Sequence, residues 1–279
     1  MKTPTFWWLA LLLLTPSVSG CGAHVSSHRC EVGFAPTSSI QSPSTDELRL
    51  IAERSGAEGS SVDELRRALA AIEELERVEG ESVDLIIWKA RVVQYMVESL
   101  DDTDDILRWC RRGERLAERI RELAPDRVEG YYFGGLFLGM RAQHQRVRAA
   151  MWLSDLEAFG RRAVESDETY DDAGPLRFLG MFLVSAPAWP LGPGDTEEGV
   201  ELLEHAVEVN DYPLNRMLLA RGLVENGDDH GACQALREAF SAPAEGRWAI
   251  TGPRWRPEAE RLATQISCQL RTPPGIAAR

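Results

Sequence analysis

The sequence has very little lysine. Only Lys2 and Lys89 occur, and the 31 basic residues are outnumbered by 44 acidic ones, which gives a formal net charge of −13. A phosphate-binding P-loop requires a lysine directly after a glycine, and neither lysine has that position, so Walker-type nucleotide binding is excluded. Nucleic acid binding requires clustered positive charge, which so acidic a chain does not favour.

Motifs of the common hydrolases are also missing. The sequence contains neither HExxH nor GxSxG, and Glu204 and His205 are neighbours that point to different faces of a helix. His24, His28 and Cys30 lie close together, but their spacing does not match a closed zinc site. We therefore expect a protein that is not an enzyme, with no catalytic residue, no metal and no cofactor.

The first twenty residues have the pattern of an export signal. Lys2 is followed by an unbroken apolar run from Phe6 to Leu14, which is too short to cross about 30 Å of hydrocarbon. Small residues then precede Cys21, as in a bacterial lipobox, where the chain is cut and the cysteine becomes the lipidated first residue. Cleavage by an ordinary signal peptidase near Gly20 is the alternative. We predict a lipoprotein signal peptide over 1–20 and lipidation of Cys21.

The residues that follow indicate where the protein is held. Gly22, rather than aspartate, comes after the cysteine, which by the usual sorting rule predicts the periplasmic face of the outer membrane. Residues 21–44 are rich in Ser, Pro and Gly, a composition that cannot bury enough apolar surface to fold and is typical of a flexible tether. We expect an α-helical repeat domain over 45–271 and a short C-terminal tail over 272–279.

The predicted domain has helical periodicity and no strand pattern. Ser61 and Glu64 form a capping box, and apolar residues then recur at helical spacing as far as Gly80. The segment 83–100 is apolar nearly all round, which indicates a helix packed on more than one side. No run of alternating apolar and polar residues is bounded by hairpin turns. The fold class is therefore predicted to be all-α.

Three segments of the chain are self-similar. The windows 118–126, 161–169 and 204–212 align without gaps. Their equivalent residues Ile120, Ala163 and Ala206 are spaced 43 residues apart. Each window ends one helix and precedes another apolar helix, over 128–143, 175–185 and 213–225 respectively. A repeated pair of helices predicts a tetratricopeptide-like helical-hairpin solenoid. Glycines inside these helices, among them Gly180 and Gly222, indicate close helix–helix approach.

One inter-helix segment is unusually stiff. Residues 186–194 contain three prolines and two glycines, and they present Trp189, Pro190 and Leu191 before Asp195, which caps the next helix. Such a loop favours a recognition surface or a pore lining. The alternative is a plug between helices, with Trp189 packed over their ends.

This loop and its flanking helices carry a resemblance. The sequence has Gly174-Pro175 with Arg177 and Leu179-Gly180, then Pro187 to Asp195, then Asp211-Tyr212-Pro213 with Asn215. Over about 125–240 it resembles the TatT family, the T component of TRAP transporters. The resemblance implies an α-helical repeat lipoprotein that partners the periplasmic solute-binding protein of a TRAP transporter and forms a homo-oligomer around a central pore.

The expected function follows from the predicted localisation, the repeats and the resemblance. We expect a helical-repeat adaptor, attached to the membrane through the lipid on Cys21, that partners a TRAP solute-binding protein. The alternative is a repeat scaffold in cell-envelope assembly with no link to transport. Both functions use the concave face of a solenoid, so they share one fold.

The cysteines allow one crosslink within the repeat domain. Cys233 lies in the helix after the turn at 227–231, and Cys268 lies in a last helix predicted over 257–270. Consecutive antiparallel helices can bring the two together, and an exported protein can keep a disulfide. Such a bond would add roughly 3–4 kcal/mol on the loop-entropy model. Two buried thiols are the alternative.

Overall fold

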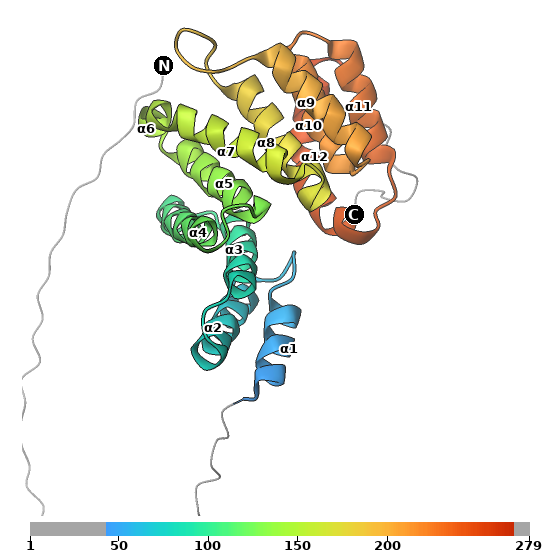
Figure 1. Cartoon of the computed structure of the whole chain (residues 1–279). Helices are drawn as coiled ribbons and strands as arrows, with labels where there is room; N and C mark the ends of the chain where they lie inside the picture. The colour runs from blue at the N-terminus through green and yellow to red at the C-terminus, as the bar shows by residue number, and fades with distance from the viewer. Residues whose placement is uncertain (1–42, 271–279) are drawn as a thin grey trace, which may run out of the picture. The chain divides into compact units, whose positions relative to one another are not determined.

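The computed structural model describes residues 43–270, and this part of the chain is almost entirely helical (Figure 1). In chain order the elements are α1 (Thr45–Ser55), α2 (Val62–Glu79), α3 (Val83–Glu98), α4 (Thr103–Leu123), α5 (Val128–His144), α6 (Arg146–Ala149), the 3-10 turn η1 (Ala150–Trp152), α7 (Leu153–Asp167), α8 (Tyr170–Ser185), α9 (Thr196–Val209), α10 (Pro213–Glu225), α11 (Asp229–Ser241) and α12 (Gly246–Gln265). Between residues 43 and 270 the one β-type contact is an isolated bridge from Ala188 to Gly194. The all-α prediction is confirmed.

Several predictions concern residues that this description does not include. The signal peptide at 1–20, the lipidation site Cys21, nearly all of the tether at 21–44 and the tail at 272–279 lie outside the described residues. Among the helices of residues 43–270, none combines the length and the apolar content needed to cross a bilayer.

Side-chain caps fix where many of the helices begin. Ser44 and Ser61 each form a capping box, in which the hydroxyl accepts the backbone N–H of a glutamate three residues on while that carboxylate accepts the N–H of the serine. Asp102, Asp195 and Asp228 cap α4, α9 and α11 through their carboxylates. Each cap satisfies a backbone donor that the helix leaves unpaired, and each places negative charge at the positive end of the helix dipole.

The helices stack as consecutive hairpins, and the sequence repeat marks equivalent positions in that stack. The pairs α4–α5, α7–α8 and α9–α10 correspond to the three aligned windows and the helices that follow them. Ile120, Ala163 and Ala206 all have no exposed surface. The repeat detected in the sequence is therefore a repeat of buried contacts, and the predicted helical-hairpin solenoid is confirmed.

Two glycines allow neighbouring hairpins to approach closely. A Cβ atom at Gly180 in α8 would lie 2.8 Å from the carbonyl oxygen of Gly199 in α9 and 2.8 Å from Cγ of Leu203. A Cβ atom at Gly199 would lie 2.8 Å from the carbonyl oxygen of Gly180. Real side chains do not reach such distances, so glycine at both positions lets the two helices touch through their backbones.

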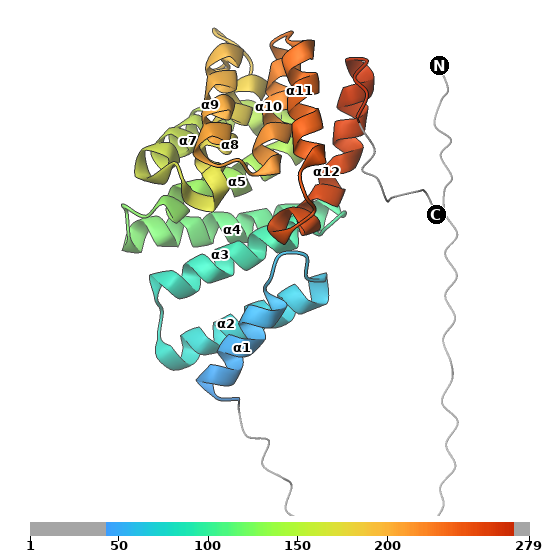
Figure 2. The same ribbon diagram turned by 90° about the vertical axis from the view of Figure 1, so that its right-hand side faces the viewer.

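The last helix differs from the sequence-based prediction. It was expected over 257–270, whereas α12 begins at Gly246 and ends at Gln265, with Pro253 and Pro257 inside it. Each proline removes a hydrogen-bond donor, but a proline inside a helix can bend it without ending it. Figure 2 shows that α12 changes direction along its length. Cys268 therefore lies beyond the helix instead of within it.

The first half of α12 returns to the N-terminal helices. Nε of Arg247 donates to the carboxylate of Glu58, in the connection between α1 and α2, over 2.6 Å. A Cβ atom at Gly59 would lie 2.7 Å from Cγ2 of Ile250, so these residues are in contact. Arg254 pairs with Glu98 at the end of α3 over 3.0 Å. The solenoid thus curls until its last helix contacts its beginning (Figure 2).

Candidate functional site

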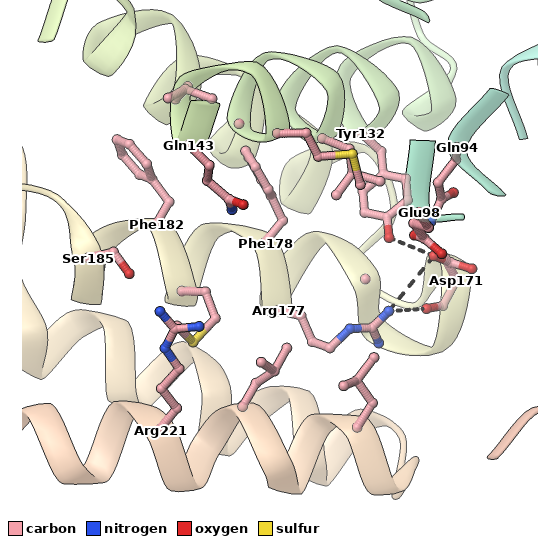
Figure 3. A pocket seen from close by; sticks show the side chains of 18 of the residues that line it. Gln94, Glu98, Tyr132, Gln143, Asp171, Arg177, Phe178, Phe182, Ser185 and Arg221 are labelled. Carbon is pink, nitrogen blue, oxygen red and sulfur yellow. Dashed lines mark hydrogen bonds and ion pairs between the residues drawn. The ribbon is translucent and has the colours of Figure 1, made fainter. Parts of the chain in front are cut away.

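The curled solenoid surrounds a cavity of about 740 Å³. Five helices supply most of its wall, namely α3, α5, α8, α10 and α12. Much of the lining is apolar, including Leu136, Met140, Phe178, Phe182, Leu218 and Trp255. In Figure 3, Phe178 and Phe182 project from one turn of α8 and the next, facing Gln143 on α5. A concave, mostly apolar cavity of this size with a few polar groups is the usual form of a ligand-binding or partner-binding site.

A cluster of charged and polar groups lies at one end of the cavity, around the buried carboxylate of Asp171 (Figure 3). Oδ1 of Asp171 accepts from Nη1 of Arg91 and from Nη1 of Arg247, each over 3.0 Å. The hydroxyl of Tyr132 donates to Oδ2 over 2.6 Å, and Nη2 of Arg177 lies 3.8 Å from the same oxygen (Figure 3). These partners come from α3, α5, α8 and α12, so a single carboxylate joins four helices.

This environment fixes the charge state of the polar end. Burial alone would raise the pKa of the Asp171 carboxyl, but Arg91, Arg247 and Arg177 together hold that pKa below its usual value. Burial, followed by the charge of Asp171, raises the pKa of Tyr132 well above its usual value. Asp171 is therefore an anion at neutral pH and Tyr132 keeps its proton, as their short hydrogen bond requires.

The backbone that presents Asp171 has an unusual conformation. Asp171, Asp172 and Ala173 have φ values of 53°, 58° and 64°, in the left-handed region that residues other than glycine rarely adopt. Such residues are disfavoured by about 1–2 kcal/mol each, so the surrounding structure must hold them in place. The sequence prediction began this helix at residue 175 and did not find the turn.

Two buried side chains hold this left-handed turn. Both terminal nitrogens of Arg177 donate to backbone carbonyl groups of the turn. Nη1 donates to the carbonyl of Asp172, and Nη2 donates to that of Asp171 over 2.9 Å. Asn215 in α10 has no exposed surface, and its Nδ2 donates to the carbonyl of Asp172 over 3.1 Å. Its Oδ1 accepts from Arg177 over 2.8 Å. Arg177 and Asn215 therefore belong to one hydrogen-bond network that holds the left-handed turn in place at this end of the cavity.

The predicted recognition loop lies at the rim of the cavity. Ala186 and Pro187 line the cavity, whereas Trp189 and Leu191 are 87% and 81% exposed. Trp189 therefore does not pack over the helix ends, and the plug alternative does not describe this loop. Asp195 lies apart from the loop tip, because its carboxylate caps α9 by accepting the N–H of Glu198 over 3.0 Å.

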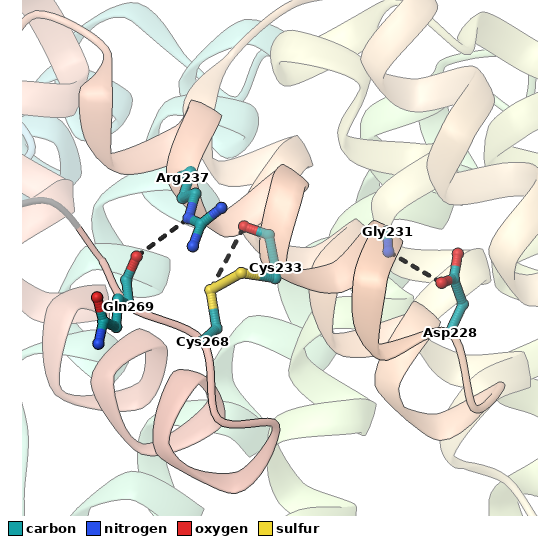
Figure 4. Close-up of a disulfide and its surroundings, with 6 residues drawn as sticks. All are labelled: Asp228, Gly231, Cys233, Arg237, Cys268 and Gln269. Atoms are coloured by element: carbon teal, nitrogen blue, oxygen red, sulfur yellow. Dashed lines mark hydrogen bonds between the residues drawn. A yellow bond between two sulfur atoms is a disulfide. The ribbon is translucent and has the colours of Figure 1, made fainter.

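The structure joins Cys233 and Cys268 in a disulfide (Figure 4). Their Cα atoms are 5.5 Å apart, and the bond ties α11 to the segment after α12. Arg237 reinforces the same junction by donating to the carbonyl of Gln269 over 3.0 Å. Cys110, in contrast, is buried, and burial raises the pKa of its thiol to about 12, so it is unreactive at neutral pH.

Within residues 43–270 no group of three or more His, Cys, Asp or Glu side chains is placed to hold a metal ion. The histidine of the Glu204–His205 pair, in α9, forms contacts with acidic residues. His205 contacts Glu168 across the α7–α9 interface, with Nε2 3.2 Å from its carboxylate. The hydrogen bond to Glu168 raises the pKa of His205.

A stripe of arginines on α4, which includes Arg112 and Arg119, pairs with acidic residues. Arg119 contacts Glu81 over 2.6 Å and Glu122 over 2.8 Å, and Arg112 contacts Glu73 on α2. This stripe therefore ties neighbouring helices together.

Comparisons with known proteins support the fold. The sequence matches no protein family profile and no curated protein. Among solved structures, it is similar to TTC0263, a thermophilic TPR protein of Thermus thermophilus, with 15% identity over 79% of this chain and 100% of that chain and a TM-score of 0.57. The MamA protein has 14% identity over 82% of this chain and 98% of its own, with a TM-score of 0.45. Yeast Tom70 has 13% identity over 79% of this chain and 59% of its own, with a TM-score of 0.31. The first of these likenesses shows a tetratricopeptide-like helical-repeat fold.

Proposed function

We propose that this protein is a lipid-anchored periplasmic adaptor, attached to the outer membrane through Cys21, that partners the solute-binding protein of a TRAP transporter. The observation that carries a binding role is the cavity of about 740 Å³ that the curled solenoid lines. Helical-repeat solenoids bind through their concave faces, and here that face is apolar with one polar end. The predicted lipobox supports the anchor, and the TatT-like residues support the choice of partner.

The polar end of the cavity supports binding more than chemistry. Asp171 is held by Arg91, Arg247 and the hydroxyl of Tyr132, and its pKa lies below its usual value. A general base works best when its pKa lies near the operating pH, and the pKa of this carboxyl is shifted away from neutral pH. In this proposal the cluster positions the walls of the cavity, and the partner or its solute contacts the apolar lining.

Affinity capture from the native envelope tests the choice of partner. The mature protein would be captured from detergent-solubilised envelope of cells that express it, and co-purifying proteins would be identified by mass spectrometry. Recovery of a TRAP solute-binding protein supports the proposal. Recovery of outer-membrane assembly factors alone supports the alternative, a scaffold in envelope assembly.

Two variants link any captured partner to the cavity. Met181→Glu places a charge on the cavity wall, and Leu123→Glu places the same charge at an exposed position on α4. We expect the first variant to lose at least tenfold in affinity for the partner and the second to bind normally. Equal affinity of both variants would show that the partner does not use the cavity. A separate test of the anchor is Cys21→Ser, which should abolish palmitate labelling and release the protein into the soluble fraction.

A further inference from the structure

An exposed apolar rim lies beside the cavity. It comprises Val147 in α6, Met151 in η1, and Trp189 and Leu191 in the loop after α8, with exposed fractions of 98%, 75%, 87% and 81%. The two segments lie next to each other, since a Cβ atom at Gly192 would lie 3.1 Å from Cδ1 of Leu153, the first residue of α7 (Figure 1). Large side chains this exposed and this close together indicate a surface that is covered in the working state.

The loop of this rim carries no charge. Residues 186–194 contain no charged side chain, and its three prolines have no N–H group to desolvate. Several of its peptide groups are already satisfied, because Gly194 donates to the carbonyl of Pro187 over 2.9 Å and Leu191 donates to that of Ala188 over 3.0 Å. Few polar groups would therefore lose water without compensation if the loop tip entered an apolar medium.

Trp189 suits the boundary between water and lipid in particular. Its ring is apolar and its N–H group is polar, and tryptophan is enriched where membrane meets water for this reason. A protein partner would also bury the ring, but it would have to supply a pocket that fits the protruding loop tip. Lipid requires only apolar area and tolerates a convex tip.

We propose that the rim formed by Val147, Met151, Trp189 and Leu191 inserts into the headgroup region of a lipid bilayer. The inference rests on the proposed function only for the presence of the anchor. If Cys21 carries lipid, the predicted tether at 21–44 joins the domain at α1, at the end opposite α6 and the loop after α8 (Figure 1). A chain of that length can span up to about 80 Å when extended, which lets the domain turn its rim toward the bilayer. Insertion would hold the cavity against the membrane surface, since Ala149, Leu153, Ala186 and Pro187 belong to its lining.

The proposal specifies the kind of lipid surface. The loop is uncharged and the chain as a whole has a net charge of −13, whereas Val147 lies between Arg146 and Arg148, so only the α6 side of the rim offers positive charge to anionic headgroups. Binding driven by apolar area responds little to salt, whereas electrostatic adsorption weakens as salt is raised. We expect the loop part of the rim to bind vesicles of neutral phosphatidylcholine and phosphatidylethanolamine, and its contribution to depend little on salt.

A vesicle-binding experiment tests the rim apart from the anchor. The mature chain carrying Cys21→Ser, which has no lipid of its own, is sedimented with neutral vesicles, and the partition coefficient is measured at low and high salt. The double variant Trp189→Ala/Leu191→Ala removes the loop tips. The matched control Val78→Ala/Leu123→Ala removes two exposed side chains, 53% and 41% exposed, from α2 and α4. Circular dichroism checks that all chains remain folded.

The expected result is a partition coefficient about tenfold or more lower for the loop variant, unchanged for the control and insensitive to salt. Equal binding by the loop variant and the parent chain would overturn the proposal. So would a failure of the parent chain to bind neutral vesicles. If the loop variant instead loses affinity for a captured partner protein while vesicle binding is unchanged, the rim is a protein-binding surface. Absence of palmitate labelling in the chain that keeps Cys21, or failure to capture a TRAP solute-binding protein, would refute the proposed function without altering this vesicle result.

Discussion

Arg247, with Ile250 and Arg254, is one of the side chains by which α12 holds the solenoid closed, and replacing it with glutamine tests its part in that role. Its guanidinium contacts Glu58 over 2.6 Å and both Asp171 and Asp172 over 3.0 Å. These partners lie in the connection between α1 and α2 and at the start of α8. Glutamine keeps part of the packing volume and removes the charge, so Arg247→Gln isolates the ionic contribution.

The magnitude follows from the burial of the partners. Removing one member of a buried ion pair destabilises a protein by about 3–5 kcal/mol, because the other charge is left uncompensated. Arg247 retains some exposure, and Asp171 keeps Arg91 and the hydroxyl of Tyr132. We therefore expect a smaller loss of about 2–3 kcal/mol in the free energy of unfolding. For a domain of this size that corresponds to a melting temperature lower by roughly 5–10 °C.

Thermal melts followed by circular dichroism measure this change, with Arg119→Gln as the matched control. Arg119 also pairs with two glutamates, but all three side chains are more than a third exposed, so we expect a much smaller loss of stability than in Arg247→Gln. Hydrogen exchange should become faster at the start of α12 in Arg247→Gln and not in the control. If both variants melt alike and exchange alike, Arg247 does not hold the closure.

Three further perturbations have defined outcomes. The pKa of the Asp171 carboxyl is lowered in the folded protein, so its ion pairs stabilise the fold fully above its usual pKa of 3.8. This stabilisation is lost as the pH falls through the lowered pKa of the folded state. The difference in stability between Arg247→Gln and the parent chain should therefore shrink in acid. Replacing Cys233 by serine should lower the free energy of unfolding by roughly 3–4 kcal/mol, which a denaturant titration measures. In the parent chain, free thiols at both Cys233 and Cys268 in a non-reducing digest would refute the bond. Gly180→Ala should destabilise the fold by about 1–3 kcal/mol, because the new Cβ meets the backbone of Gly199. At Gly139 the nearest atom lies 3.5 Å from a new Cβ, so Gly139→Ala should stabilise α5 by up to about 1 kcal/mol.

The repeat and the core were predictable because they depend on local order. Ile120, Ala163 and Ala206 recur at a fixed spacing, and each is fully buried where neighbouring helices pack. Capping residues such as Ser61 act within four residues of the chain. Periodicity and capping are properties of a short window, so a sequence contains them in readable form.

The polar end of the cavity was not predictable in the same way. Arg91, Asp171 and Arg247 meet only because the solenoid curls, and the first and last of them lie 80 and 76 residues from the aspartate along the chain. Nor does Asp171-Asp172-Ala173 indicate a left-handed turn, since glycine is the residue that favours this conformation. One usable signal was present, namely Pro175, which belongs in the first turn of a helix and so indicates a break just before it.

The residues that carry the TatT resemblance gain a physical explanation from the fold. Arg177 and Asn215 hold the carbonyl groups of the left-handed turn, and Gly180 allows α8 to touch α9. All three act on the backbone of this chain, so these residues have a structural role here. The choice of partner must instead depend on side chains that face open space, which are those of the cavity lining and of the Trp189 rim. Variants at Met181 and Trp189 therefore report on function, while variants at Arg177 and Asn215 report on folding.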